Sequence, residues 1–187
     1  MSRINTPKTI AESPEKSRPV LENVNRMMGS VPNIFRLIGN SPAVLEGYVA
    51  VSGALTKGDL DPATRERIAI AIANVNGCKY CNSAHTYLGS KLAKLSDEEI
   101  HENRHGRSND PKADVAVKFA VEAARSRGNI SQERLSEVLD AGYSEAEALE
   151  IVGHVALNTL TNYVNEIFQT EIDFPVAELA GCQKCSA

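Results

Sequence analysis

The chain has 187 residues, of which 42% are hydrophobic and 24% charged, the composition of one globular domain. Its formal net charge of −4 offers no basic surface for a phosphate backbone, so nucleic-acid binding is not expected. No apolar run approaches the ~20 residues that a bilayer span requires, and the first residues lack the apolar core of a secretory signal. We therefore expect a cytoplasmic protein without a membrane segment.

Changes in composition divide the chain into three parts. Residues 1–19 are polar, contain proline and show no apolar period, which is typical of an extended arm. Residues 20–175 alternate segments of helical length with glycine and proline breakers, and we expect them to form a single domain. Residues 176–187 follow the last helical pattern and form a short tail.

Four helix starts carry recognisable capping signals. Asp61 and Asp110 each precede a proline, so each predicts an N-cap followed by proline at the first helical position. Ser96 and Ser144 each have a glutamate three residues later, which fits the capping box. These signals predict a mainly helical domain.

One segment has an alternative interpretation as a strand, because Ile68, Ile70 and Ile72 alternate with alanines. The segment 62–76 has no breaker, is too long for a typical strand and is rich in alanine, which favours helices. We therefore predict an all-α bundle in which the 62–76 helix is buried on nearly all sides.

All four cysteines fall in two Cys-x-x-Cys pairs, Cys78/Cys81 and Cys182/Cys185. In a reducing compartment such pairs indicate redox chemistry or a metal site. The tail pair has two interpretations: it passes electrons to a Cys78/Cys81 disulfide by thiol exchange, or it consists of incidental thiols.

The first pair belongs to the most informative cluster of the sequence. If a helix begins after Gly77, Cys78 lies in its first turn, where unpaired N–H groups stabilise a thiolate. His85 follows Cys81 by one turn and can accept or return its proton, while the two sulfurs share a helix face and can close a disulfide. Glu66 lies among isoleucines and alanines, where a carboxylate needs a partner or a task.

The order of Glu66, Cys78, Cys81 and His85 resembles the core motif of the AhpD-like alkylhydroperoxidases, within the carboxymuconolactone decarboxylase superfamily. The similarity runs from about residue 31 to residue 175 and includes the segments around Asn158 and the Thr-Glu-Ile-Asp-Phe-Pro sequence at its end. The resemblance implies an AhpD-like helical bundle. It also implies a homo-oligomer, commonly a trimer or a hexamer, with the active site near subunit contacts.

The resemblance further implies a role for each motif residue. Cys81 would be the peroxidatic cysteine that becomes a sulfenic acid, Cys78 the resolving thiol, and Glu66 with His85 the proton relay. The expected substrate is a small organic hydroperoxide and the expected reductant an external dithiol of the lipoyl type, with no bound cofactor and no metal. Well-known members have a histidine between the cysteines; Tyr80 stands there here, which implies a shorter relay.

Several polar side chains around this motif have structural alternatives. Tyr80, His154 and Asn158 are candidates for hydrogen-bonding support around the site, and a direct catalytic role for His154 is a further hypothesis. The carboxylate of Glu66 could instead form a structural ion pair with Arg65, Arg67 or another basic residue.

Two other functions stay open from the sequence. The first is a non-catalytic oligomeric protein that binds a ligand or senses oxidants through the thiol pair. The second is a structural zinc module in which Cys78, Cys81 and His85 are joined by one cysteine of the tail. Redox turnover with a dithiol distinguishes the peroxidase from the first, and bound metal distinguishes it from the second.

Overall fold

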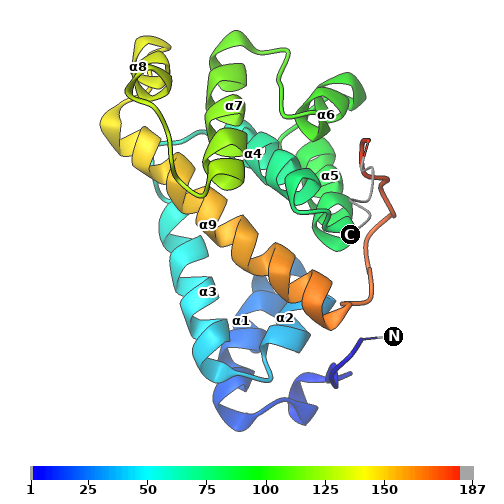
Figure 1. The fold of residues 1–187 in the computed structure, drawn as a ribbon. Helices are drawn as coiled ribbons and strands as arrows, with labels where there is room; N and C mark the ends of the chain where they lie inside the picture. Colours follow the sequence, from blue (N-terminus) through cyan, green and yellow to red (C-terminus); the bar gives the residue numbers. More distant parts are fainter. Residues whose placement is uncertain (1, 182–187) are drawn as a thin grey trace.

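The computed structural model describes residues 2–181, which form helices and no strand (Figure 1). The all-α fold is confirmed. The α-helices of this part are α1 (Arg18–Met28), α2 (Asn33–Ile38), α3 (Pro42–Leu55), α4 (Pro62–Val75), α5 (Lys79–Lys91), α6 (Asp97–Arg104), α7 (Pro111–Ser126), α8 (Gln132–Asp140) and α9 (Glu145–Phe168). None of these helices is both long and apolar enough to cross a membrane.

Helix α4 lies at the centre of the bundle and contacts α5, α6, α7 and α9. The Asp61 side chain caps it by accepting a hydrogen bond from the backbone N–H of Thr64 at 2.9 Å. Every residue from Ile68 to Ala73 is buried. The alternation of isoleucine and alanine is therefore compatible with a helix, because α4 is covered on all sides and its alanines let neighbouring helices approach closely.

The two predicted capping boxes differ in the structure. The box of Ser144 and Glu147 is complete, because each side chain bonds to the backbone N–H of the other. At α6 the Ser96 side chain accepts from the N–H of Glu99, but the Glu99 carboxylate turns inward to Arg67 instead of returning to Ser96. The second box is therefore half formed, because an ion pair with α4 takes the carboxylate.

The N-terminal residues are more folded than an extended arm. Short 3-10 helices occupy Ile10–Glu12 and Glu15–Ser17, and α1 follows directly at Arg18. The buried Ser17 hydroxyl donates to the carbonyl of Gly39 at 2.7 Å. This contact ties the start of the domain to the end of α2.

Helix α9 has an inverted distribution of polarity. Its inner face buries polar side chains, namely His154, Asn158, Thr161, Asn162 and Asn165. Its outer face exposes large apolar side chains, namely Leu149, Val152, Leu160, Tyr163 and Ile167. The buried polar side chains of α9 can form hydrogen bonds inside the molecule, and its exposed apolar side chains form a surface that a partner could cover.

After α9 the chain continues as a segment without helix that runs beside α5 (Figure 1). We call residues 170–181 the strap. Three side-chain contacts fix it to α4 and α5: Tyr80 with Asp173, Ser83 with Ala177, and Asn74 with Ala180. The strap therefore covers the helix that carries the first cysteine pair.

Candidate active site

The first cysteine pair sits at the turn between α4 and α5. Gly77 has a φ of 70°, a left-handed conformation that suits glycine and lets the chain reverse between the helices. Cys78 is the N-cap of α5, and its sulfur accepts the backbone N–H of Cys81 at 3.2 Å. The two sulfur atoms are 2.6 Å apart, and both residues are buried, with exposed fractions of 0% and 3%. The pair is thus placed to close a disulfide between neighbours on one helical turn.

The surroundings of the two sulfurs favour a thiolate at Cys81. Burial opposes ionisation of Cys81, but hydrogen bonds from Cys78 and from Asn165, whose Nδ2 lies 3.1 Å away, together with the charge of His85, lower its pKa below the ordinary value. The hydrogen bond to Cys81 and burial raise the pKa of Cys78. The position of Cys78 at the helix terminus predicted that Cys78 would be the ionised cysteine. The structure instead favours ionisation of Cys81, because the Cys78 thiol donates a hydrogen bond to the Cys81 sulfur.

Glu66 of α4 and His85 of α5 face each other across the helix pair. The Glu66 Oε2 lies 2.9 Å from Nδ1 of His85, and the two side chains are 23% and 24% exposed. Burial opposes a charge on His85, but the Glu66 carboxylate and the Cys81 thiolate raise its pKa above the ordinary value. The negative charges of Glu66 and Cys81 therefore favour the protonated form of the His85 imidazole, which can then donate a proton.

The closeness of α4 and α5 at this point depends on Gly89. A Cβ atom at Gly89 would lie 3.2 Å from a methyl group of Leu95, 3.4 Å from one of Ile70, and 3.9 Å from the Cβ of Glu66. Gly89 also lies one turn after His85 on the same face of α5. The missing side chain lets the two helices approach where Glu66 meets His85.

The arginines beside Glu66 bind elsewhere. Arg67 pairs with Glu99 at 2.6 Å. Arg65 donates to the backbone carbonyls of Leu55 and Thr56, at 3.3 and 2.7 Å. The alternative in which Glu66 forms a structural ion pair with one of these arginines is therefore wrong.

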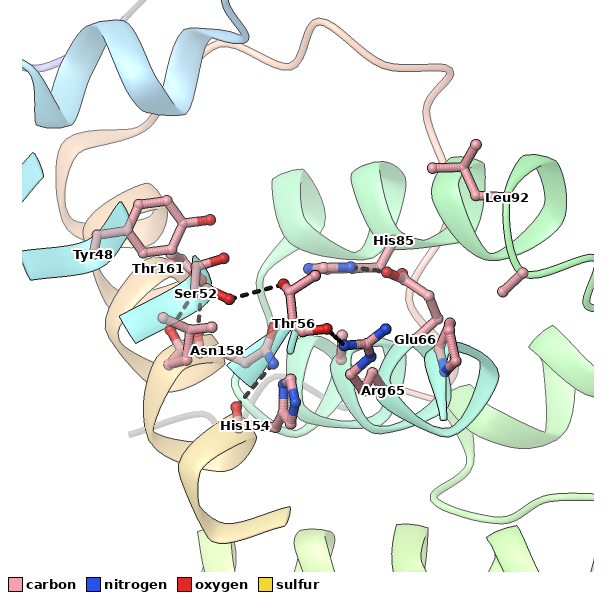
Figure 2. Close-up of a pocket in the computed structure, with 14 residues that line it drawn as sticks. Tyr48, Ser52, Thr56, Arg65, Glu66, His85, Leu92, His154, Asn158 and Thr161 are labelled. Carbon is pink, nitrogen blue, oxygen red and sulfur yellow. Dashed lines mark hydrogen bonds and ion pairs between the residues drawn. The ribbon is translucent and has the colours of Figure 1, made fainter. Parts of the chain in front are cut away.

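A cavity of about 300 Å³ opens on the Glu66 and His85 side chains (Figure 2). Its walls come from α3, α4, α5 and α9 and the segment that follows α5; the labelled lining residues are Tyr48, Ser52, Thr56, Arg65, Glu66, His85, Leu92, His154, Asn158 and Thr161. Neither Cys78 nor Cys81 is among the residues that line it. A small molecule in this cavity would meet the imidazole before it met the sulfur.

His154 and Asn158 line this cavity opposite Glu66 and His85. His154 is 7% exposed, and its Nε2 has no hydrogen-bond partner among the described residues. Burial and the nearby Arg65 lower its pKa, so His154 is neutral at pH 7. Asn158 donates to the backbone carbonyl of His154 at 2.8 Å. His154 and Asn158 therefore line the same cavity as Glu66 and His85.

Tyr80 points away from this cavity, toward the strap. Its hydroxyl donates to Asp173 at 2.8 Å and accepts the backbone N–H of Ile34 at 3.2 Å. Burial raises its pKa far above the ordinary value for tyrosine. Tyr80 therefore anchors the strap and takes no place beside Glu66 and His85.

Within residues 2–181 no group of three histidine, cysteine, aspartate or glutamate side chains could hold a metal ion. Cys78, Cys81 and His85 therefore do not form such a group among themselves. The tail cysteines Cys182 and Cys185, which the zinc interpretation requires, lie outside the described residues.

Two residues near the sulfurs carry roles that sequence reasoning did not assign. Asn165 donates to Cys81 from 84 positions away, and the partly buried Tyr48 lines the cavity, with its pKa raised to about 12 by burial and by the charges of Cys81 and Glu66. A polar position on a largely apolar helix was the available signal for Asn165, but the pattern does not say which group it meets.

Comparison with known proteins relates the central helices to a family. Residues 42–126 match the carboxymuconolactone decarboxylase family. The match covers the central part of the chain, from α3 to α7. No curated protein matches the chain.

Solved structures with the same fold span most of the chain. It is similar to a peroxidase-related protein with an alkylhydroperoxidase AhpD core from Ralstonia eutropha JMP134, with 21% identity, a TM-score of 0.82 and coverage of 92% of each chain. A peroxidase-related protein from Silicibacter sp. TM1040 has 21% identity and a TM-score of 0.79, over 96% of this chain and 94% of that one. The debrominase Bmp8, in complex with 2,3,4-tribromopyrrole, has 19% identity and a TM-score of 0.75, over 92% and 94%. These similarities show the AhpD-like fold.

Proposed function

We propose that this protein is a thiol-dependent peroxidase that reduces small organic hydroperoxides through a Cys78/Cys81 disulfide. The observation that carries the proposal is the arrangement around Cys81. This sulfur contacts Cys78, accepts a hydrogen bond from Asn165 and has a lowered pKa through the charge of His85. A nucleophile, a resolving thiol and a proton donor are therefore within the first two turns of α5.

The oxidative step uses Cys81 as the nucleophile. Its thiolate attacks the terminal oxygen of the hydroperoxide, so that an S–O bond forms, the O–O bond breaks and an alkoxide leaves. The sulfur becomes a sulfenic acid and the peroxide gains two electrons. His85 gives the alkoxide the proton that makes it an alcohol, while Glu66 holds the imidazole in position.

The resolving step uses Cys78. Its sulfur attacks the Cys81 sulfenic acid, the disulfide forms, and water leaves. An external dithiol, for which we propose a lipoyl-type carrier, then returns two electrons and becomes a disulfide itself. The complete cycle converts a hydroperoxide and a dithiol into an alcohol, water and a disulfide.

The test begins with the reduced Cys182→Ser/Cys185→Ser variant, so that only two thiols are counted. One equivalent of tert-butyl hydroperoxide should remove both thiols and give a Cys78–Cys81 disulfide, identified by mass spectrometry of peptides. Dihydrolipoamide should then support repeated turnover, and Cys81→Ser should abolish it. Oxidation without any turnover by a dithiol would instead support the redox-sensing interpretation.

The substrate class is tested in the same assay. Because a debrominase shares the fold, 2,3,4-tribromopyrrole serves as a competing electron acceptor at equal concentration. The hydroperoxide should oxidise the thiol pair faster. Faster oxidation by the bromopyrrole would contradict the hydroperoxide assignment while leaving the disulfide chemistry in place.

We also propose that the outer face of α9 joins copies of the chain in a homo-oligomer, a trimer or a hexamer. The exposed apolar side chains of α9 recur at spacings of three, four and eight residues, which places them on one helix face, and α3 adds exposed Val44 and Val51. Light scattering should give the mass of an oligomer for the wild type. A Leu160→Glu/Tyr163→Glu variant should give a smaller species, whereas a wild-type monomer would contradict the proposal.

A further inference from the structure

A second cavity lies beside the turn that carries the sulfur pair. It has a volume of about 710 Å³ and lies between the start of α5, the end of α9 and the strap. Gly77 and Lys79, the neighbours of Cys78 on both sides, line it. It shares no lining residue with the cavity at Glu66 and His85. Two separate cavities are therefore lined by neighbours of the sulfur pair, and neither cavity is lined by a sulfur itself.

The two cavities present different groups to the sulfurs. The first offers Glu66 and His85, which protonate a leaving oxygen. The second offers Asn165, which bonds to Cys81, and Glu166, which lines the cavity with Lys79. Burial raises the pKa of Glu166, and the Cys78 thiol and the Lys79 backbone N–H act against this rise. Cys78 thus has a carboxyl group on the side of the second cavity, away from the histidine.

We propose that a dithiol enters this second cavity and attacks the Cys78 sulfur of the oxidised protein, with Glu166 moving the proton. This inference rests on the disulfide chemistry of the proposed function and adds the site of reduction. It separates the two half-reactions in space, because the hydroperoxide approaches from the Glu66 and His85 side.

The chemistry of disulfide exchange supports attack at Cys78. When the donor thiolate attacks Cys78, a mixed disulfide forms and Cys81 leaves with the electron pair of the S–S bond. Cys81 is the better leaving group because its thiolate is stabilised by Asn165 and by the charge of His85. Attack at Cys81 would expel Cys78, whose thiolate has neither contact.

Glu166 accounts for the proton in this step. Burial raises its pKa above the ordinary value for a glutamate, so it exchanges protons more readily near neutral pH. It takes a proton from a donor thiol and returns it to Cys78 when the second donor thiol displaces that sulfur. The other proton of the dithiol replaces the one that His85 gave to the alkoxide. The donor ends as a disulfide and both protein sulfurs are reduced.

The dithiol has two available sources. One is an external carrier, and the other is the Cys182/Cys185 pair, which follows closely after the strap residues Glu178 and Leu179 that line the cavity. The strap is held at Ala180, whose N–H and carbonyl both bond to the side chain of Asn74, at 2.9 and 3.2 Å. Both sources share the same chemistry and the same target sulfur.

The site of attack can be read directly in the Cys182→Ser/Cys185→Ser variant. The Cys78–Cys81 disulfide is formed with diamide, so that the test does not depend on peroxidase activity. Cysteamine, a monothiol, is then added briefly, the mixture is quenched with iodoacetamide, and the peptides are analysed by mass spectrometry. We expect cysteamine on Cys78 and the alkyl group on Cys81. The reverse assignment would overturn the proposal.

The role of Glu166 is tested by measuring the rates of the oxidative and reductive half-reactions separately. Glu166→Gln should slow reduction of the diamide-formed disulfide by dihydrolipoamide at least tenfold and leave oxidation by hydroperoxide unchanged. Glu166→Asp should restore part of the rate, and Glu22→Gln, an exposed carboxylate on α1, serves as the matched control. Equal slowing of both half-reactions would indicate a structural role for Glu166 and contradict this part.

The source of the dithiol is distinguished by comparing the wild type with the Cys182→Ser/Cys185→Ser variant. If the tail pair relays electrons, the variant is reduced by dihydrolipoamide more slowly. If the carrier attacks directly, the two rates agree. A failure of the proposed function looks different from either result, because then the hydroperoxide does not form the Cys78–Cys81 disulfide at all.

Discussion

Helix α4 carries two adjacent side chains that take part in quite different ion pairs. Arg67 pairs with Glu99, whose carboxylate also accepts hydrogen bonds from Asn103, Ser108 and the backbone of Asn109. Glu66 is one position away and, among the described residues, accepts a hydrogen bond from His85 alone. Glu99 is 8% exposed, whereas Glu66 is 23% exposed at the wall of a cavity.

The difference shows how a structural carboxylate can be told from a functional one. Four donors saturate Glu99 and tie α4 to α6 and to the segment that leads into α7, so this carboxylate has no capacity left for a substrate. Glu66 retains free acceptor sites and faces an open space. Its partner is a histidine, a side chain that can gain and lose a proton, whereas the partner of Glu99 is a permanently charged arginine.

The largest expected effect on stability belongs to Glu99→Gln. This change leaves the guanidinium of Arg67 without its partner in a mostly buried position, which should lower the free energy of unfolding by about 3 kcal/mol. Urea denaturation measures the loss. The rate of hydroperoxide reduction by the protein that remains folded should change by less than about twofold. A large loss of this rate without a loss of stability would contradict the assignment of Glu99 as a structural carboxylate.

Glu66→Gln should give the reciprocal result. Without the carboxylate, His85 loses the charge that raises its pKa, so the rate of Cys81 oxidation at pH 7 should fall by roughly 10²-fold. The free energy of unfolding should change by about 1 kcal/mol or less, because the pair is partly exposed. Stopped-flow measurement of thiol loss gives the rate. Retention of the full rate would show that Glu66 has no part in the proton relay.

The two pairs should also respond to pH in opposite directions. The hydrogen bonds from Ser108 and Asn103 outweigh burial and lower the pKa of Glu99 to about 2, so its stabilisation is present above the unfolded value of about 4.3 and is lost as the pH falls toward 2. The folded pKa of His85 is raised, so its stabilisation is present below about pH 6.5 and is lost as the pH rises through the folded pKa. Thermal unfolding of the wild type and the two Gln variants should show each loss separately.

The smallest effect concerns the other contact of the reactive sulfur. Asn165→Leu removes one hydrogen bond to the Cys81 thiolate, worth about 1 kcal/mol, and should raise the pKa of Cys81 and lower its oxidation rate at pH 6 roughly fivefold. The pH dependence of iodoacetamide labelling measures the pKa. An unchanged titration curve would show that His85 alone holds the thiolate.

The features that were predictable from the sequence are those encoded locally. The cap at Asp61 and the isoleucine and alanine pattern predict the buried helix α4, and the spacing of Cys78, Cys81 and His85 places them on the first two turns of α5. Contacts between distant segments were not predictable from such patterns. Asn165 meets Cys81 from 84 positions away, because only the packing of α5 against α9 brings them together.

Tyr80 and the half-formed capping box illustrate the same limit. A residue between two cysteines looks like part of the site, but its hydroxyl bonds to Asp173, which lies 93 positions later in the strap. The Glu99 carboxylate leaves the cap of its own helix for Arg67, 32 positions earlier, and for three donors from residues 103–109. In both places a tertiary contact outweighs the local preference.

The absence of a side chain at Gly89 has a consequence for the speed of proton movement. Proton transfer between two heavy atoms slows steeply as their separation grows. The distance between α4 and α5 therefore limits how quickly a proton can pass between Glu66 and the His85 imidazole. That distance is held by Ile70 and Leu95, which lie against the bare backbone of Gly89. Apolar packing one helical turn away thus sets the distance between the carboxylate and the imidazole.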